Sequence, residues 1–379
     1  MSTFFPRDVF SAENSIPRVM IAPARYIQGN GVLDHLGRYL SLIPARHVVV
    51  MISSGGQRRI GDRVGDALVS AEITHSTHLF DRECSYEAVE NVVTAVRAEP
   101  AQPDSLIAIG GGKCIDAGKA IAFRLGVPVV VCPTVASTDA PTSAVAVMYS
   151  ESGIAIGGEF YRDSPAMVVV DSGIIATAPP RFLAAGIADA LASVYEIRVN
   201  VANPNGRSMV GGRPPLAVQA MVEAVGKVLF RDSVAAMAAV RQRQVTDALD
   251  NVIEANTLGS GIGFESGGLA VVHAIAKGLT VIRSLREDCL HGELVAIGIL
   301  TQLLLLDEIE EAQRVIELFR PIGLPTCLSD LGLDAETDLS EVVAMAMDAP
   351  FVHNVGLIDG VRVSAEILAN ALHKLDTKH

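Results

Sequence analysis

The chain has 379 residues, of which 50% are hydrophobic and 19% are charged, and its formal net charge is -13 at pH 7. This length predicts two domains, because single hydrophobic cores seldom extend beyond about 250–300 residues. The acidic charge, without any basic cluster, argues against binding to nucleic acid or to a membrane surface. The five cysteines are scattered, no secretory signal is evident and no apolar run reaches the roughly 20 residues of a membrane-spanning helix, so we expect a cytoplasmic protein with reduced thiols.

Short apolar runs alternate with amphipathic stretches through the first half of the chain. Residues 85–98 (SYEAVENVVTAVRA) illustrate the helical type, with Ser85 as the expected N-cap. On a second expected helix, residues 113–124, we expect Asp116 and Lys119 to form an exposed ion pair. Alternating strands and helices predict a parallel, Rossmann-like α/β domain. The expected strands include residues 47–52, 73–80, 106–109, 127–132 and 167–171.

The pattern changes near Ala178-Pro179-Pro180. Beyond this point Ala, Leu, Glu and Arg recur at helical spacing, as in residues 234–254 and 294–319. We therefore expect the α/β domain to span residues 1–178 and an all-α domain to span residues 179–379. The glycine-rich stretch 259–268 predicts tight turns or close helix crossings within the second domain.

One stretch of the first half has the composition of an anion-binding turn. The apolar run 106–109 leads through three glycines, residues 110–112, into a helical stretch. Glycines let the backbone approach a ligand, and the unpaired N–H groups at the start of the helix attract a pyrophosphate. The strand expected at 127–132 leads into a hydroxyl-rich loop, residues 133–143 (PTVASTDAPTS), which would line the same crevice. A purely structural glycine turn is the alternative.

Three residues of the second half are candidate metal ligands: Asp189, His273 and His291. Two neutral imidazoles and one carboxylate form a ligand set that leaves a coordination position open for water or substrate. The chain has no HExxH motif, and a histidine on an apolar helix face is often a buried, hydrogen-bonded residue. The pattern alone therefore leaves both a metal site and a structural role open.

Several long motifs are specific enough to compare with known families: IGGGKCIDAGKA at 109–120, PTVASTDAPTSAVAVMYSESG at 133–153, APPRFLAAGIADALASVYE at 178–196, EANTLGSGIGFESGGLAVVHAI at 254–275 and LHGELVAIGILTQL at 290–303. They resemble those of the glycerol dehydrogenases, which belong to the metal-dependent, iron-containing alcohol dehydrogenase superfamily. The resemblance implies the dehydroquinate synthase-like architecture, an α/β domain followed by a helical domain, and a homo-oligomer, in this family an octamer. It also implies an oxidoreductase that transfers hydride between glycerol, or a related vicinal diol, and NAD, giving dihydroxyacetone.

The resemblance also assigns roles to individual residues. Asp189, His273 and His291 match the metal ligands of the family, and both Zn²⁺ and Fe²⁺ accept such a set. Asp139 matches the residue at the substrate position, with a loop cap as its alternative role. A divalent cation at this place lowers the pKa of the substrate hydroxyl, so that hydride can pass to the nicotinamide. The residues that match the cofactor site are Gly110, Gly111, Gly112, Lys113, Thr134, Ser137, Ser143, Val145 and Tyr149.

The chain departs from the family pattern at positions that bear on specificity. Residues 53–56 (SSGG) follow the strand 47–52, where the family carries an aspartate that binds the adenine ribose. Without this carboxylate a 2′-phosphate is not rejected, so the cofactor could be NADP as well as NAD. Ala276, Lys277 and Leu294 replace family residues near the ligands, which leaves open a different substrate. Two alternatives therefore remain: an enzyme of the same fold that acts with NAD(P) on another, phosphorylated polyol, and a catalytically silent nucleotide-binding scaffold.

Overall fold

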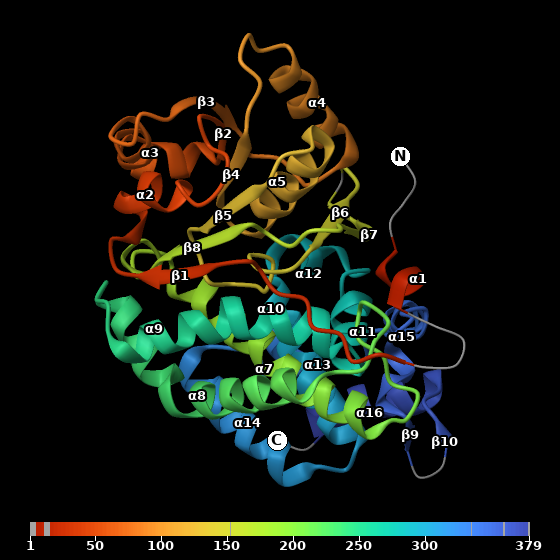
Figure 1. Cartoon of the computed structure of the whole chain (residues 1–379). Helices are drawn as coiled ribbons and strands as arrows, with labels where there is room; N and C mark the ends of the chain where they lie inside the picture. The colour runs from red at the N-terminus through yellow and green to blue at the C-terminus, as the bar shows by residue number, and fades with distance from the viewer. Residues whose placement is uncertain (1–4, 11–15, 152, 335, 359–360, 378–379) are drawn as a thin grey trace.

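The computed structural model describes residues 5–10, 16–151, 153–334, 336–358 and 361–377. In the view of Figure 1, a sheet with its flanking helices forms the upper part of the molecule and a body of helices forms the lower part. None of the described helices is both long enough and apolar enough to cross a membrane. The helices that precede residue 178 are α1 (Pro6–Phe10), η1 (Val32–His35), α2 (Leu36–Leu40), α3 (Ser54–Val69), α4 (Tyr86–Arg97), α5 (Gly112–Leu125) and α6 (Ser172–Ile175).

Six parallel strands form the central sheet in the order β1-β8-β5-β4-β2-β3. Central strands are covered on both faces, and so they form continuous apolar runs; every residue of β4 is buried. The outer strand β3 is half exposed and more polar, so its sequence lacks the continuous apolar run of the central strands. The expected strands are confirmed with small changes at their ends. The strands are β1 (Tyr26–Gly29), β2 (His47–Ile52), β3 (Thr74–Leu79), β4 (Ser105–Gly110), β5 (Val129–Pro133) and β8 (Met167–Asp171).

Helices cover both faces of the sheet. Ile52 of β2 lies in one hydrophobic cluster with Leu68 of α3, whereas the preceding Met51 lies in another cluster with Val93 of α4 and Ile121 of α5. Successive side chains of a strand point to opposite faces, so the two clusters mark the two sides of the sheet. The expected N-cap of α4 is confirmed, because the Ser85 side chain accepts a hydrogen bond from the backbone N–H of Ala88.

An antiparallel hairpin, β6 (Val145–Tyr149) and β7 (Ala155–Phe160), lies beside α5 and was not expected from the sequence. The exposed glycines Gly157 and Gly158 interrupt the alternation that would have indicated β7. The hairpin matters for the site because the hydroxyl-rich loop runs directly into β6.

The helical part is organised around α13, in which every residue after His291 is buried. It packs against α7, α11 and α16. The expected helical character is confirmed, and the strands β9 (Leu357–Ile358) and β10 (Val361–Arg362) are the only ones beyond residue 179 in the described part of the chain. The helices are α7 (Pro180–Ala202), α8 (Leu216–Arg241), α9 (Asp247–Glu254), η2 (Ala255–Gly259), α10 (Ser260–Ile262), η3 (Gly263–Gly267), α11 (Val271–Leu279), α12 (Arg283–Asp288), α13 (His291–Leu305), α14 (Ile309–Ile322), η4 (Ser329–Leu331), α15 (Ser340–Met347), η5 (Val352–Val355) and α16 (Ala365–Thr377).

The glycine-rich stretch forms close helix crossings, as the sequence predicts. Residues 247–267 form one helical run in which two π-helical segments, η2 and η3, flank α10. A Cβ atom on Gly263 would lie 3.0 Å from the Ser193 side chain, and one on Gly267 would lie 2.6 Å from Ile197. The glycines therefore let this run lie directly on α7, the helix that carries Asp189.

The segment before β1 connects the two parts of the molecule. The backbone N–H of Ile21 donates to the Ser266 hydroxyl at 2.8 Å, and that of Val19 donates to the Arg213 carbonyl at 3.2 Å. Gln28, on β1, donates to the Asp250 carbonyl at 2.8 Å. Figure 1 shows this segment running down from β1 along the helical part. The division of the chain at residues 178 and 179 stays a prediction.

Candidate metal centre and cofactor crevice

The glycine turn joins β4 to α5. Gly111 is the N-cap of α5 and provides no side-chain cap, so ligand atoms can approach the first N–H groups of the helix. A Cβ atom on Gly110 would lie 2.7 Å from the Cys114 side chain, which excludes a larger residue there. The Thr134 N–H donates to the Gly110 carbonyl at 3.0 Å and so joins the turn to the hydroxyl-rich loop. This cradle suits the pyrophosphate of a dinucleotide.

Lys119 is buried beneath the hydroxyl-rich loop, and the prediction of an exposed ion pair with Asp116 was wrong. The Lys119 side chain is 2% exposed, and its Nζ atom lies 2.9 Å from Asp116 Oδ1. Nζ also donates to the carbonyls of Ala140, at 2.9 Å, and of Val145. Asp116 in turn accepts the Val147 N–H at 3.1 Å. The pair is buried because the loop and β6 cover this face of α5, and it fastens both of them to the helix.

The other residues matched to the cofactor lie along the same edge of the sheet or beside it. Ser143, at 2% exposure, is held by Lys119 at 3.4 Å, and Val145 begins β6. Tyr149 ends β6, where its N–H donates to the Cys84 carbonyl at 2.9 Å, and burial raises the pKa of its hydroxyl. Lys113 instead forms an ion pair with Glu83 at 2.5 Å, with 61% of its side chain exposed. Thr134 and Ser137 are buried within the loop.

The three candidate metal ligands lie together in the helical part. Asp189 lies on α7, His273 on α11 and His291 at the start of α13. The Nε2 atoms of both histidines lie 3.4 Å from Asp189 Oδ1, and the three ligand atoms are within 4.8 Å of one another. Two atoms bound to one tetrahedral ion at about 2.0–2.1 Å are roughly 3.4 Å apart.

The environment of Asp189 also fits a cation. Its side chain is 1% exposed, and no described residue donates a hydrogen bond to Oδ1. A buried carboxylate oxygen without a donor is costly unless a cation neutralises it. Its other oxygen accepts the backbone N–H of Asp139 at 3.2 Å. The residues present therefore fit a divalent metal ion, and His291, whose side chain is 46% exposed, is the most solvent-accessible of the three candidate ligands.

Glu196 belongs to the same candidate site and was missed by the sequence interpretation. Its fully buried carboxylate accepts a hydrogen bond from His273 Nδ1 at 2.6 Å and the backbone N–H groups of Ala270 and His273 at 2.7 and 3.0 Å. A proton held on Nδ1 leaves Nε2 free as a ligand. The available signal was spacing, since Asp189 and Glu196 are seven residues apart and share one face of α7.

The charges of the site perturb one another. Burial favours a neutral imidazole, but Glu196 and Asp189 prevail and raise the pKa of His273 well above its ordinary value of 6.5. Burial opposes ionisation of Asp189 as well, yet the two histidines hold its pKa below the ordinary value. Burial and the neighbouring charge of Asp189 raise the pKa of Asp139. Such a concentration of shifted groups is typical of a reaction centre.

The departures from the family pattern lie on the same helices as the two histidines, with Ala276 and Lys277 on α11 and Leu294 on α13. Ala276 and Leu294 belong to the hydrophobic core, with exposures of 0% and 2%. Lys277 lies near the surface, where its Nζ is 3.9 Å from Asp348.

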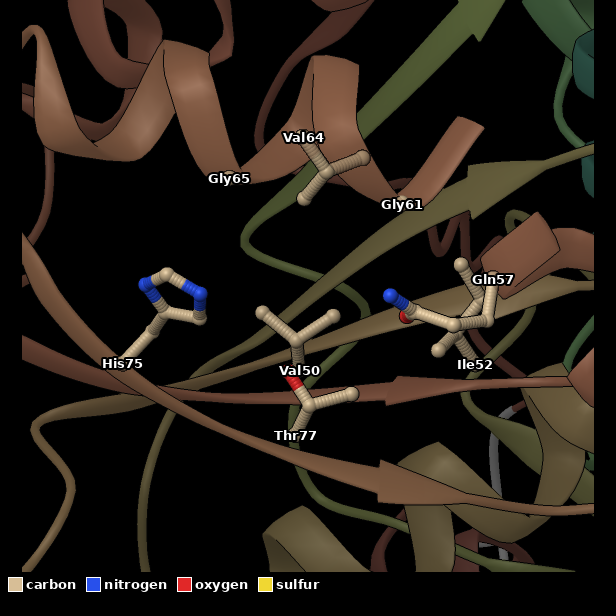
Figure 2. Close-up of a pocket in the computed structure, with 8 residues that line it drawn as sticks. All are labelled: Val50, Ile52, Gln57, Gly61, Val64, Gly65, His75 and Thr77. Carbon is tan, nitrogen blue, oxygen red and sulfur yellow. The ribbon is translucent and has the colours of Figure 1, made fainter. Parts of the chain in front are cut away.

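A small cavity of about 40 Å³ lies elsewhere, between α3 and the strands β2 and β3. Figure 2 shows Val50, His75 and Thr77 on its strand side and Gly61 and Gly65 on α3 above them. It is separate from the metal centre.

Comparison with known proteins agrees with this geometry. Residues 27–179 match the family model described as iron-containing alcohol dehydrogenase. The chain is 40% identical over 350 residues to a glycerol dehydrogenase of Escherichia coli O6:H1, covering 89% of this chain and 92% of the relative. It is 37% identical over 347 residues to a glycolaldehyde reductase of Halobacterium salinarum, with the same coverage. The solved structure of glycerol dehydrogenase from Schizosaccharomyces pombe superposes with a TM-score of 0.90 at 30% identity, covering 97% of this chain and 92% of that one. The chain belongs to the iron-containing alcohol dehydrogenase family, in the group that contains the glycerol dehydrogenases.

Proposed function

We propose that this protein is a metal-dependent oxidoreductase that transfers hydride between glycerol, or a related vicinal diol, and NAD, giving dihydroxyacetone. The observation that carries the proposal is the arrangement of Asp189 Oδ1 with His273 Nε2 and His291 Nε2, each nitrogen 3.4 Å from the oxygen. The similarity to several glycerol dehydrogenases supports the same reaction. Zn²⁺ is the first candidate for the ion and Fe²⁺ the second.

The residues of the chain divide the work between its two parts. Asp189, His273 and His291 would hold the ion, which when bound lowers the pKa of a coordinated alcohol. The glycine turn would hold the pyrophosphate, and the residues after β5 would lie along the nicotinamide and its ribose. Asp139, joined to Asp189 through its backbone N–H, would accept a hydrogen bond from a second hydroxyl of the diol. A vicinal diol matches this pair of neighbouring groups.

The phosphorylated polyol and the silent scaffold have less support. A phosphorylated substrate calls for a cation in the cleft, and Lys277, the candidate near the ligands, lies beside Asp348 at 3.9 Å with 38% of its side chain exposed. A silent scaffold would not preserve the costly burial of Asp189 opposite two histidines.

We also make proposals about oligomeric state, cellular location and domain division. We propose a homo-oligomer, an octamer by analogy with the family, located in the cytoplasm. We also propose that residues 1–178 and 179–379 form the cofactor domain and the metal domain.

The test follows NADH formation with glycerol by absorbance, in protein as purified, after treatment with a chelator, and after zinc is restored. Activity that the chelator removes and zinc restores is the expected result. Protein that contains stoichiometric zinc but reduces neither NAD nor NADP with glycerol would refute the glycerol assignment. The same assay with glycolaldehyde and NADH examines the reductase activity named for the Halobacterium salinarum relative.

A further inference from the structure

A carboxylate lies beside the end of β2, although the sequence has no acidic residue there. Ser53 caps α3 by accepting the Gly56 N–H at 3.1 Å. The Ser54 N–H donates to Asp81 Oδ1 at 2.9 Å, and the Ser54 hydroxyl donates to Asp81 Oδ2. Asp81 follows the neighbouring strand β3 and is exposed. The charge missing from residues 53–56 is therefore supplied from an adjacent strand.

The order of the strands places Asp81 at the adenosine end of the crevice. Ile52 of β2 pairs with Ile109 of β4 on one side and with Leu79 of β3 on the other, and all three strands are parallel. The hydroxyl-rich loop follows β5, the glycine turn follows β4, and Ser54 and Asp81 follow β2 and β3. A dinucleotide with its pyrophosphate on the glycine turn and its nicotinamide beside the loop extends its adenine ribose toward β2.

We propose that Asp81, held by Ser54, binds the hydroxyls of the adenine ribose and makes the protein select NAD over NADP. The inference rests on the proposed function and adds to it the choice of cofactor. A carboxylate accepts hydrogen bonds from the 2′- and 3′-hydroxyls, whereas the 2′-phosphate of NADP carries negative charge and is repelled. The Ser54 N–H and hydroxyl orient the carboxylate and leave its remaining lone pairs for the ribose.

Two arginines of α3 offer the competing arrangement, a cation for the 2′-phosphate. Arg59 donates from Nε to the Gly55 carbonyl at 3.2 Å, and so its guanidinium is directed back along its own helix. Arg58 lies close enough to Asp81 to favour the ionised carboxylate, after the larger effect of the Ser54 hydrogen bonds, and the pKa of Asp81 is lowered. A phosphate near Arg58 would have to lie next to this carboxylate.

The test measures binding rather than turnover. Titration calorimetry gives the dissociation constants of NAD and NADP for the metal-loaded protein without substrate. The variants are Asp81→Asn, Arg58→Ala and the matched control Asp62→Asn, which removes one exposed carboxylate further along α3. We expect the unaltered protein to bind NAD at least about 10-fold more tightly than NADP, and Asp81→Asn to reduce that ratio by about 10-fold or more. Asp62→Asn should leave the ratio unchanged.

Each contrary result has a distinct meaning. Equal or tighter binding of NADP by the unaltered protein would overturn the inference, as would an unchanged ratio in Asp81→Asn. Weaker NADP binding in Arg58→Ala, with NAD unaffected, would assign the 2′-phosphate to Arg58 and overturn it as well. Failure of the unaltered protein to bind either dinucleotide would instead refute the proposed function on which the inference depends.

Discussion

Glu196 and His273 share a hydrogen bond of 2.6 Å, between Oε2 and Nδ1, which joins a fully buried carboxylate on α7 to a ring on α11 that is 10% exposed. It fixes which ring nitrogen carries the proton and turns Nε2 toward Asp189. The same carboxylate accepts two backbone N–H groups at the start of α11. Glu196 therefore sets both the orientation of the ring and the position of the helix that carries it.

Replacing Glu196 with Ala should weaken zinc binding by roughly 10- to 100-fold, because the ring of His273 loses its partner. Glu196→Gln should retain part of the affinity, since an amide oxygen still accepts from Nδ1. The measurement is competition with a chromophoric zinc chelator, with circular dichroism to verify folding. Glu265→Gln is the matched control, because Glu265 is also buried but accepts the Ala144 N–H instead. An unchanged zinc affinity in folded Glu196→Ala would contradict the positioning role.

Zinc affinity should rise with pH until His273 no longer carries a proton in the metal-free protein. Its pKa is raised well above 6.5 by Glu196 and Asp189 in spite of burial, and metal binding must displace a proton. The sign for stability follows: protonated His273 stabilises the metal-free fold below the unfolded pKa, and this contribution is lost as the pH rises through the folded value. The gain in melting temperature upon adding zinc should therefore grow with pH. A gain that is constant or falls with pH would contradict this linkage.

Gly261→Ala should destabilise the protein by about 1–3 kcal/mol and impair activity. A Cβ atom there would lie 1.8 Å from the Thr142 hydroxyl and 2.9 Å from the Asp139 carbonyl, so the loop or the helix must move. The matched control is Gly65→Ala, at the cavity of Figure 2, where a Cβ atom meets nothing within 4 Å.

In the control, helix propensity should stabilise the protein by about 0.5–1 kcal/mol. Urea unfolding measures both changes. Equal effects of the two substitutions would show that the crossing at Gly261 is looser than the distances indicate.

Lys119→Met should cost about 3–5 kcal/mol, because it leaves Asp116 buried without its cation. The double variant Lys119→Met with Asp116→Leu should recover part of this loss. Burial already raises the pKa of Asp116 against the opposing effect of Lys119, so removing Lys119 raises it further. At low pH the Asp116 carboxyl is protonated and neutral, so its burial without Lys119 costs less. The destabilisation caused by Lys119→Met should therefore increase with pH. Urea unfolding at two pH values measures the free energy of unfolding of each variant. If the effects of Lys119→Met and Asp116→Leu simply add in the double variant, the two residues are not coupled.

The sequence was sufficient to predict the architecture and to select three candidate ligands that the structure brings together. Short apolar runs and helical spacing predicted the elements, and the resemblance to the family singled out Asp189, His273 and His291. These residues lie on three separate helices, so their spacing in the sequence does not show that they are close together in the fold. The glycine turn was predictable from local chemistry alone, because the requirement for glycine arises within a few residues.

The errors arose where a distant segment determines the environment. Asp116 and Lys119 are three residues apart on a helix, which is the usual spacing of an exposed pair, and only the hairpin that covers α5 makes them buried. Asp81 follows β3, whereas Ser54 begins α3 after β2, so the carboxylate beside Ser54 comes from a separate part of the sequence. Glu196 was predictable in principle from its spacing to Asp189.

The bond between the Asp139 N–H and Asp189 joins the hydroxyl-rich loop to a candidate metal ligand without any intervening residue. An ion that fixes Asp189 therefore also restricts the loop on which the nicotinamide would lie, and a dinucleotide that orders the loop restricts Asp189. Thermodynamic reciprocity requires the two affinities to change by the same factor. A chelator should therefore remove less zinc at equilibrium when NAD is bound, and zinc should tighten the binding of NAD by the same factor.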